Sequence, residues 1–375
     1  MEKEYTQRLE KIEAVLDKWL PEAPDSSWLE MVFGSQLNSA VKGTPELAGL
    51  ITRPGWDLVK RGGKRWRPLL MVLAAEAIAG ECGFEVALSL TPLVEFPHNA
   101  SLIHDDIEDN SDERRGKPAV HLIYGMDTAI NSGAFMYFLP LACLSAWTGE
   151  YSKEKSGDVV AEWKNRMWQV WASHMRALHL GQAMDIAWHR DFYSLPDLDE
   201  YDRMCRLKTG CLARLAAVLG VYSGVFAAGE TFNKESNLKA LEEAFAGAAE
   251  QLGVGFQILD DVKNLTTGVP GKKRGDDIVE GKKSLPVLLY LHRYPEKKDF
   301  AARCFTAARN TGVEAPEVEE FISKLERAEV IEEARIKALS YIQKSTMFFS
   351  NSGFAGFSFK KEGMKLLAGF PGLLL

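Results

Sequence analysis

Hydrophobic residues recur at intervals of three and four through most of the chain, and runs that alternate between apolar and polar residues are nearly absent. This spacing is typical of helices with a buried face. It predicts long helices over residues 68–80, 87–109, 212–229 and 244–262, several of which are apolar on more than one face. The pattern therefore indicates an all-α fold, a single large helical bundle with a central apolar cavity.

Stretches rich in Gly, Pro, Ser, Asn and Asp interrupt the helical spacing. They fall at residues 62–63, 80–83, 152–158, 194–197, 229–237 and 267–275. Cutting the chain there leaves roughly ten helices. None of these stretches has the character of a linker between domains. The hydrophobic residues, 46% of the chain, are enough to fill one large core. We therefore expect one domain over residues 1–375.

The charge balance and the cysteines limit what the chain binds. The 45 Lys and Arg residues against 52 Asp and Glu residues give a net charge of −7, which argues against a broad nucleic-acid surface. An anionic ligand must then be held by local features. The five cysteines are scattered and never spaced as Cys-x-x-Cys, so neither a disulfide framework nor a zinc site is indicated.

The N-terminal segment is acidic and amphipathic, without the cationic start and apolar block of a signal peptide, so we expect a cytoplasmic protein. Two apolar stretches could be mistaken for membrane anchors. Residues 128–149 carry no charge but contain Asn, Ser, Gly and Pro, and residues 366–375 are too short to cross a bilayer of about 30 Å. We predict no transmembrane segment and take both stretches to be buried or in peripheral contact with a membrane.

Two distant helices end in similar acidic sequences. The side chains involved are Asp105, Asp106 and Asp109 in the first and Asp260, Asp261 and Asn264 in the second. In each helix the first and last of these lie one turn apart on the same face. Aligned carboxylates at the ends of apolar helices repel each other and lose hydration, so they usually imply cations. Oxygen ligands without His or Cys suit Mg²⁺, which bridges protein carboxylates to a substrate's phosphates.

Other interpretations of these residues exist. An isolated Asp-Asp pair often just ends a helix at the solvent, but two pairs that each follow largely apolar residues weaken that explanation. Glu95 and His98 have the Glu-x-x-His spacing of carboxylate-bridged di-iron bundles. Such bundles need a second copy of the spacing, and the sequence has none. His98 is therefore expected to be a hydrogen-bond donor or a core histidine.

Basic residues cluster near these acidic helices. The segment GGKRWRP at 62–68 combines glycines and three basic side chains with the start of an apolar helix, which suits an anion, although a solvated basic loop is the ordinary alternative. Further basic residues are Arg114, Arg115, Lys208, Lys272 and Lys282. Mg²⁺ between the acidic helices would neutralise a diphosphate, and a dry cavity would protect an allylic cation. The residues thus point to metal-triggered ionisation of an isoprenoid diphosphate.

Several motifs occur together and in order. They are GGKRWRP at 62–68, HNASLIHDDIEDNSDERRGKP at 98–118, GQAMDI at 181–186, KTG at 208–210, GFQILDDVKN at 255–264 and GKKRGDDIVEGKKSLP at 271–286. On these motifs the sequence resembles the trans-isoprenyl diphosphate synthases, and geranylgeranyl diphosphate synthases in particular. The resemblance covers about 62–286. It implies an all-α homodimer that condenses isopentenyl diphosphate head-to-tail with an allylic diphosphate.

The resemblance also implies roles for single residues. Asp105 and Asp109 would ligate two Mg²⁺ ions with support from Asp106, and Asp260 would ligate another near Asp261, giving about three ions per active site. Arg114, Lys208 and Lys272 would bind the allylic diphosphate, and Lys64, Arg67, His98 and Arg115 the isopentenyl diphosphate. Thr209 and Gln257 would lie beside the developing cation, and Lys282 would guard the second acidic cluster. Asn264 replaces an Asp found in many members, which implies weaker metal affinity.

Product length depends on residues before Asp105. Ser101 and Ala100, four and five positions earlier, are small where farnesyl synthases often have aromatics, so the tunnel should run deeper. Phe96 lies a turn further on, about 5.4 Å, close to one isoprene unit, which favours a C20 product. Pro97 should disturb this helix, and ordinary core packing explains Phe96 equally well. A C15 product, or one of C25 and above, stays open.

Three other functions compete with this assignment. A class I terpene synthase shares the ionisation but has no use for a second diphosphate site, and a squalene-type synthase would likewise lack GGKRWRP and RRG. A non-catalytic regulatory subunit could lose its metal ligands, yet all five aspartates of the two clusters are present. The synthase therefore explains more of the sequence than its alternatives do.

Overall fold

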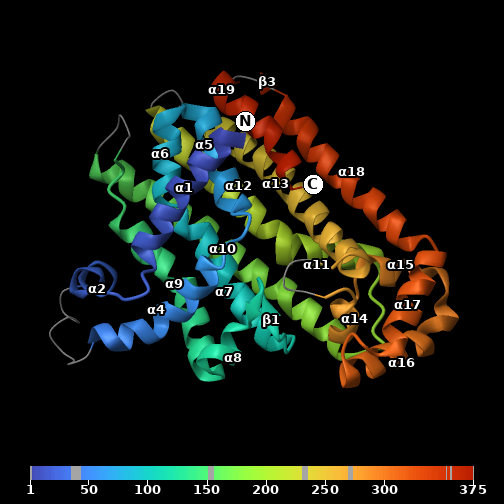
Figure 1. Ribbon diagram of the computed structural model, residues 1–375. Helices are drawn as coiled ribbons and strands as arrows, with labels where there is room; N and C mark the ends of the chain where they lie inside the picture. The colour runs from blue at the N-terminus through green and yellow to red at the C-terminus, as the bar shows by residue number, and fades with distance from the viewer. Residues whose placement is uncertain are drawn as a thin grey trace.

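The computed structural model describes residues 2–34, 44–150, 156–229, 235–268, 273–351, 353–354 and 357–374. Nearly all of these residues are helical (Figure 1). Within them, the strands form two short antiparallel pairs, β1 (Glu113–Arg114) with β2 (Lys117–Pro118) and β3 (Gly353–Phe354) with β4 (Phe357–Ser358). The predicted all-α class is confirmed.

The centre of the molecule consists of α5 (Trp66–Ala79), α7 (Pro92–Glu108), α12 (Cys211–Ala228) and α13 (Glu235–Thr266). Every residue of α5 from Trp66 to Ile78 is buried, as expected of a helix that is apolar on all sides. Gly220 lets α12 approach α5 closely, because a Cβ at this position would collide with the Met71 carbonyl oxygen.

The remaining N-terminal and middle helices surround this centre (Figure 1). They are α1 (Glu2–Trp19), α2 (Ser26–Phe33), α4 (Thr44–Lys60), α6 (Glu81–Ser89), α8 (Val120–Tyr124), α9 (Met126–Ala146) and α10 (Gly157–Arg190). After α10, the chain passes through α11 (Leu198–Cys205) and a π-helical turn, η1 (Arg206–Gly210), into α12. This turn contains the KTG motif.

The C-terminal part, where the sequence after about residue 290 offered no motif, is also helical. It contains α14 (Asp276–Glu280), α15 (Leu285–Arg293), η3 (Pro295–Lys297), α16 (Lys298–Thr311), α17 (Pro316–Arg327), α18 (Val330–Ser350), α19 (Lys361–Gly369) and η4 (Phe370–Leu373). Helix α18 packs along α13, and α19 returns to α5, where the Lys360 amide donates to the Ala77 carbonyl at 2.8 Å. These helices make the described elements more numerous than expected.

Two described helical segments, Met126–Ala146 and Leu198–Ala228, are long and apolar enough to span a membrane. The most apolar part of the second is 89% buried inside the protein, so its composition is that of a core helix. The corresponding part of the first is 44% buried, and it leaves apolar side chains such as Ile130 and Phe138 on the surface.

Pro97 lies inside α7 without ending it, so the expected disturbance is confined to one lost hydrogen bond of the helix. Proline has no N–H, and the carbonyl of Leu93 therefore loses its helical partner. The indole Nε1 of Trp171, on α10, donates to that carbonyl at 3.0 Å. This bond replaces the missing one and ties α10 to α7.

We expect Trp171→Phe to lower the free energy of unfolding by about 1–3 kcal/mol, because it leaves the buried Leu93 carbonyl unpaired. Urea denaturation measures the loss. Trp168→Phe is the matched control on the same helix, since Trp168 is 43% exposed. Equal losses in the two variants would show that the hydrogen bond contributes nothing.

Candidate active site

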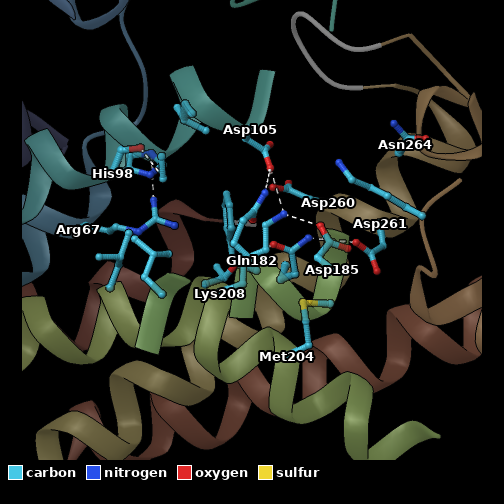
Figure 2. Close-up of a pocket in the computed structure, with 18 of the residues that line it drawn as sticks. Arg67, His98, Asp105, Gln182, Asp185, Met204, Lys208, Asp260, Asp261 and Asn264 are labelled. Carbon is cyan, nitrogen blue, oxygen red and sulfur yellow. Dashed lines mark hydrogen bonds and ion pairs between the residues drawn. The ribbon is translucent and has the colours of Figure 1, made fainter. Parts of the chain in front are cut away.

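A cavity of about 420 Å³ lies between α5, α7, α10 and α13, with η1 and residues 282–284 closing its sides. Its apolar lining comes from Leu102, Leu178, Met204, Leu212 and Phe256. Most of the polar residues predicted from the sequence line the rest of it, and Figure 2 shows Asp105 from α7 and Asp260 from α13 on its wall. The cavity therefore has one region lined by charged side chains and another lined by apolar side chains.

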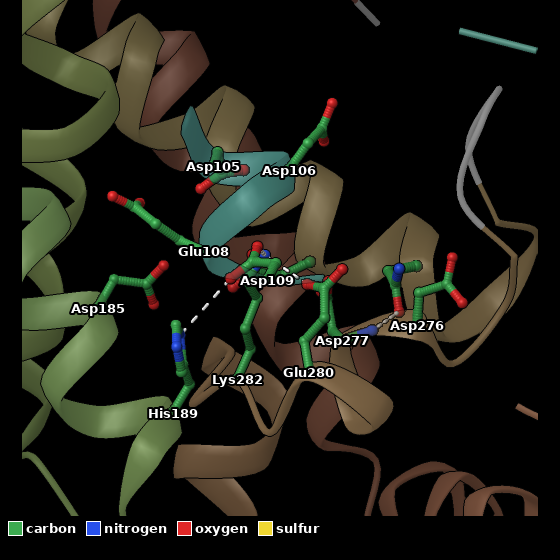
Figure 3. Close-up of polar contacts among 12 residues, drawn as sticks. Asp105, Asp106, Glu108, Asp109, Asp185, His189, Asp276, Asp277, Glu280 and Lys282 are labelled. Carbon is green, nitrogen blue, oxygen red and sulfur yellow. Dashed lines mark hydrogen bonds and ion pairs between the residues drawn. The ribbon is translucent and has the colours of Figure 1, made fainter. Parts of the chain in front are cut away.

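The first acidic cluster lies at the end of α7. Asp105 lines the cavity, and its Oδ1 accepts hydrogen bonds from Gln182 Nε2 at 2.9 Å and Lys208 Nζ at 3.1 Å. The Asp109 side chain is fully buried behind it, with Oδ2 2.7 Å from Lys282 Nζ (Figure 3). Burial, reinforced by Asp105, raises the pKa of Asp109 to about 7.

Asp106 has a different role from its neighbours. Its carboxylate is buried and accepts from Arg114 Nε at 2.8 Å and also from Arg114 Nη2. It is not part of the cavity wall. These two bonds fit the supporting role implied for Asp106. They orient the guanidinium of Arg114, whose Nη2 lies 3.6 Å from Asp105 Oδ2.

All three residues of the second acidic cluster line the cavity, and Asp261 and Asn264 also have hydrogen-bond partners in the protein. Asp260 lines the cavity, and no hydrogen bond or ion pair from the described residues reaches it. Burial, together with the charge of Asp261, raises the pKa of Asp260 to about 6. Lys263, Lys64 and Arg67 are near enough to oppose this rise without pairing with the carboxylate, which leaves its oxygens suited to a cation.

The sequence placed Asp261 and Asn264 among the metal ligands, and the structure gives both side chains other contacts. Both oxygens of Asp261 accept hydrogen bonds, Oδ1 from Gln257 and Oδ2 from Tyr201 and the Leu285 amide. Asn264 Oδ1 accepts from the Asp277 amide at 3.1 Å. Figure 2 shows Asn264 at the edge of the site, apart from Asp260. These bonds hold both side chains in orientations set by the protein.

The basic residues of the first motif gather at the other side of the cavity. Arg67 Nη1 lies 3.2 Å from His98 Nε2 (Figure 2). The guanidinium also stacks over the Trp66 ring, 4.4 Å from its centroid. Burial and the adjacent Arg67 hold the pKa of His98 well below its ordinary value, so the imidazole is neutral. Because a guanidinium only donates, Nε2 accepts and the ring proton is on Nδ1. Lys64 lines the same side.

Arg65 and Glu95, neither of which received a role from the sequence, form a buried support for the basic side of the cavity. Arg65 Nη1 contacts Glu95 Oε1 at 3.1 Å, and Asn99 Nδ2 donates to the same oxygen at 2.9 Å. Asn99 Oδ1 in turn accepts from Arg115 Nη1 at 3.1 Å. These bonds occupy the Glu95 carboxylate and orient Arg115 toward the cavity. Because Glu95 already has these partners, the structure gives no support to the di-iron alternative.

The KTG motif faces both clusters. Lys208 Nζ bridges Asp105 Oδ1 and Asp185 Oδ2, 2.6 Å away. Burial opposes its charge, but these two carboxylates raise the pKa of Lys208 above its usual value. The hydroxyl of Thr209 donates to Gln257 Oε1 at 2.6 Å. The π-turn therefore presents an ammonium and a hydroxyl side by side.

Sequence reasoning missed Gln182, Asp185 and Tyr201, all of which line the cavity. The first two belong to the GQAMDI motif, which was noted without roles, whereas nothing in the sequence marks Tyr201. Lys272 lies outside the described residues. Of the chain-length residues, Ser101 lines the cavity, whereas Ala100 and Phe96 are fully buried and do not.

Comparison with known proteins identifies the family and the fold of the chain. A geranylgeranyl pyrophosphate synthase from Eremothecium gossypii is 35% identical over 243 residues, 64% of this chain and 68% of that protein. One from Rhodocybe pseudopiperita is 36% identical over 56% of this chain, and the match spans only 54% of that relative. The crystal structure of geranylgeranyl pyrophosphate synthetase from Pyrococcus horikoshii shares the fold, with a TM-score of 0.73, 24% identity and coverage of 99% and 98%. The polyprenyl synthetase family model matches residues 49–323, and the chain therefore belongs to this family of trans-prenyltransferases.

Proposed function

We propose that the protein condenses isopentenyl diphosphate head-to-tail with an allylic diphosphate, and that its main product is C20 geranylgeranyl diphosphate. The observation that carries this proposal is that two different anion sites open on one apolar cavity. One, around Asp105 and Asp260, is rich in carboxylates and needs cations. The other, around Arg67 and Arg115, has an excess of basic groups and needs none.

The proposed cofactor is Mg²⁺, with about three ions in each active site. The donor set suits it, because Asp109 Oδ1 is buried without a hydrogen-bond partner among the described residues. In the same part of the chain no three carboxylate, imidazole or thiol groups converge on one point, so phosphate oxygens would complete the ligand shells. Asp105, Asp109 and Asp260 would hold the ions. Bound Mg²⁺ would supply the charge neutralisation that lets a diphosphate leave.

The remaining groups act on the substrate's own atoms. Lys208 and Arg114 would bind the allylic diphosphate, together with Lys282 and Lys272. Leu102 and Leu178 exclude water from the hydrocarbon chain, and so protect the cation from being quenched. Thr209 and Gln257 lie beside the carbon that becomes cationic. The departing diphosphate takes the proton that the condensation releases, so no protein base is required.

The isopentenyl diphosphate would lie against Lys64, Arg67, His98 and Arg115. A neutral His98 with its Nε2 occupied by Arg67 offers its Nδ1 proton as a hydrogen-bond donor. The ring thereby fixes the guanidinium without adding a competing charge. Arg115 is fixed in the same way by Asn99. Both guanidiniums are thus oriented before substrate binds.

Ser101 is the side chain through which α7 limits product length, because it lines the cavity and Phe96 does not. We expect Ser101→Phe to shorten the main product to C15 or below, since an aromatic ring would fill the path of the growing chain. Phe96→Ala serves as the control and should leave the C20 product unchanged. Chromatography of the dephosphorylated products measures both. A longer product from Phe96→Ala would restore Phe96 as the floor.

The proposed assembly is a cytoplasmic homodimer in which residues 1–375 form one domain. The exposed apolar side chains of α8 and α9 give a second copy a surface to cover. They are Leu122, Ile123, Met126, Ile130 and Phe138. Burying such side chains stabilises association, and peripheral contact with a membrane is the other use of this surface.

The test of the proposed function is incubation of the purified protein with labelled isopentenyl diphosphate, Mg²⁺ and C5, C10 or C15 allylic diphosphates. Homologous elongation to C20 is the expected result. A hydrocarbon product would indicate a terpene synthase instead. Absence of turnover without a second polypeptide would indicate a regulatory subunit.

A further inference from the structure

Four side chains form a continuous hydrogen-bonded line along the cavity wall, from Tyr201 to Thr209. The Tyr201 hydroxyl donates to Asp261 Oδ2 at 2.6 Å, and Gln257 Nε2 donates to Asp261 Oδ1 at 3.1 Å. Thr209 Oγ1 donates to Gln257 Oε1 at 2.6 Å. The Leu285 amide is a further donor to Asp261 Oδ2, at 3.0 Å. All four side chains line the cavity.

The direction of each bond follows from the chemistry of its ends. The Leu285 amide can only donate, and the phenol of Tyr201 keeps its proton because burial raises its pKa well above the ordinary value. A carboxylate is an acceptor only. Asp261 therefore forces Gln257 to turn its NH₂ group toward Oδ1. The amide oxygen of Gln257 must then face Thr209.

The orientation of Gln257 fixes that of Thr209. With an acceptor in front of it, the Thr209 hydroxyl gives its proton to Gln257. The lone pairs of Thr209 Oγ1 then remain for the cavity, next to Lys208 on the same π-turn. Oxygen lone pairs aimed in advance at a carbon that becomes positive stabilise the cation, whereas a hydroxyl proton in the same place would repel it.

We infer that Asp261 and Tyr201 are positioning residues that set the polarity of the Gln257–Thr209 pair, rather than ligands of the metal. This inference rests on the proposed function, because polarity matters only if a cation forms beside Thr209. It assigns the two aspartates of the second cluster to different tasks. Asp260 is left for the cations, and Asp261 accepts hydrogen bonds from the protein.

The decisive variant is Asp261→Asn, which keeps the shape of the side chain and changes only its donor pattern. The Tyr201 hydroxyl and the Leu285 amide both donate to the Oδ2 position. The side-chain oxygen of the introduced asparagine therefore takes that position, and its NH₂ group faces Gln257. Gln257 must then flip, present its NH₂ to Thr209 and turn the Thr209 proton toward the cavity. The bonds from position 261 to Gln257 and from Gln257 to Thr209 both survive with their directions reversed.

We expect Asp261→Asn to lower kcat by about 10- to 100-fold. The Mg²⁺ concentration for half-maximal activity should stay within about twofold of wild type, as should the KM of both substrates. The double variant Asp261→Asn/Gln257→Glu should recover most of kcat, because the introduced carboxylate accepts from both neighbours and returns the Thr209 proton to its original direction. A merely structural role for Asp261 predicts no such recovery.

Asp260→Asn is the matched control, with the same chemical change one residue away. It should raise the Mg²⁺ requirement, and it should diminish the rise in thermal unfolding temperature that Mg²⁺ with inorganic diphosphate produces. Asp261→Asn should retain that rise, which is a readout independent of turnover. If Asp261→Asn does not fold, Tyr201→Phe removes one donor from the line and should lower kcat a few-fold at an unchanged Mg²⁺ requirement.

Two results would overturn the inference while leaving the proposed function intact. One is an Asp261→Asn enzyme that needs more Mg²⁺ just as Asp260→Asn does, which would make Asp261 a metal ligand. The other is an Asp261→Asn enzyme with the wild-type kcat. A wild-type protein that turns over none of the allylic diphosphates would instead overturn the proposed function, and the catalytic role of the line with it.

Discussion

Asp105→Ala is expected to lower kcat by about 10³-fold or more at saturating Mg²⁺, because it removes the cavity-facing oxygens of the first acidic cluster. Neither of the other two aspartates of that cluster lines the cavity. Asp106 is bound to Arg114, and Asp109 lies buried behind Lys282. Steady-state assays with a C15 allylic diphosphate measure the loss.

The loss should arise in catalysis and not in folding. Lys208 keeps Asp185 as a partner at 2.6 Å, so the ammonium next to Asp105 does not become an isolated buried charge. Thermal unfolding of Asp105→Ala should therefore resemble that of wild type. Asp112→Ala, a few residues on and exposed, is the control and should retain full activity. A near-normal rate for Asp105→Ala at high Mg²⁺ would refute the role of Asp105.

Sequence spacing predicted the parts of the site that lie within one helix. The positions of Asp105 and Asp109 follow from the period of α7, and Gln257, Asp260 and Asn264 share a face of α13 for the same reason. The helix breaks at Gly62, Gly80 and Gly275 were predictable too, since these glycines take positive φ angles. The break between α6 and α7, at residues 90–91, falls inside the helix predicted over 87–109 and was missed. Features that depend only on residues close together in the chain can thus be predicted from the sequence.

Features that depend on contacts between helices could not be predicted in this way. The spacing of an Asp-Asp pair does not show that Asp261 turns toward Tyr201, which comes from α11, sixty residues earlier. The same is true of Asp185, whose partner Lys208 lies beyond a loop and another helix. Sequence spacing left Phe96 open as a tunnel floor or as ordinary core, and in the structure it is fully buried and outside the cavity lining. Which face of a helix meets a cavity is decided by its neighbours.

Arg67→Ala is expected to raise the KM of isopentenyl diphosphate about 10- to 100-fold and to change that of the allylic substrate less than about threefold. We expect the two substrates to differ because of where Arg67 lies in the cavity. Arg67 lies with His98 on the side of the cavity that Asp105 and Asp260 do not occupy, and its guanidinium is buried between Trp66 and His98. A charge-assisted hydrogen bond to phosphate at a buried site contributes about 1.5–3 kcal/mol, which gives the stated range.

Arg67→Lys and Arg53→Ala complete the Arg67 experiment. The lysine keeps the charge but loses the paired donors and the stacking on Trp66, so the KM of isopentenyl diphosphate should fall between wild type and Arg67→Ala. Arg53 is exposed and outside the cavity, and its removal should change neither KM. Equal weakening of both substrates by Arg67→Ala would mean that the two diphosphates share one site. In that case the division of the cavity into a metal-dependent and a metal-free half would be wrong, and the order in which the substrates bind would have to follow from competition instead.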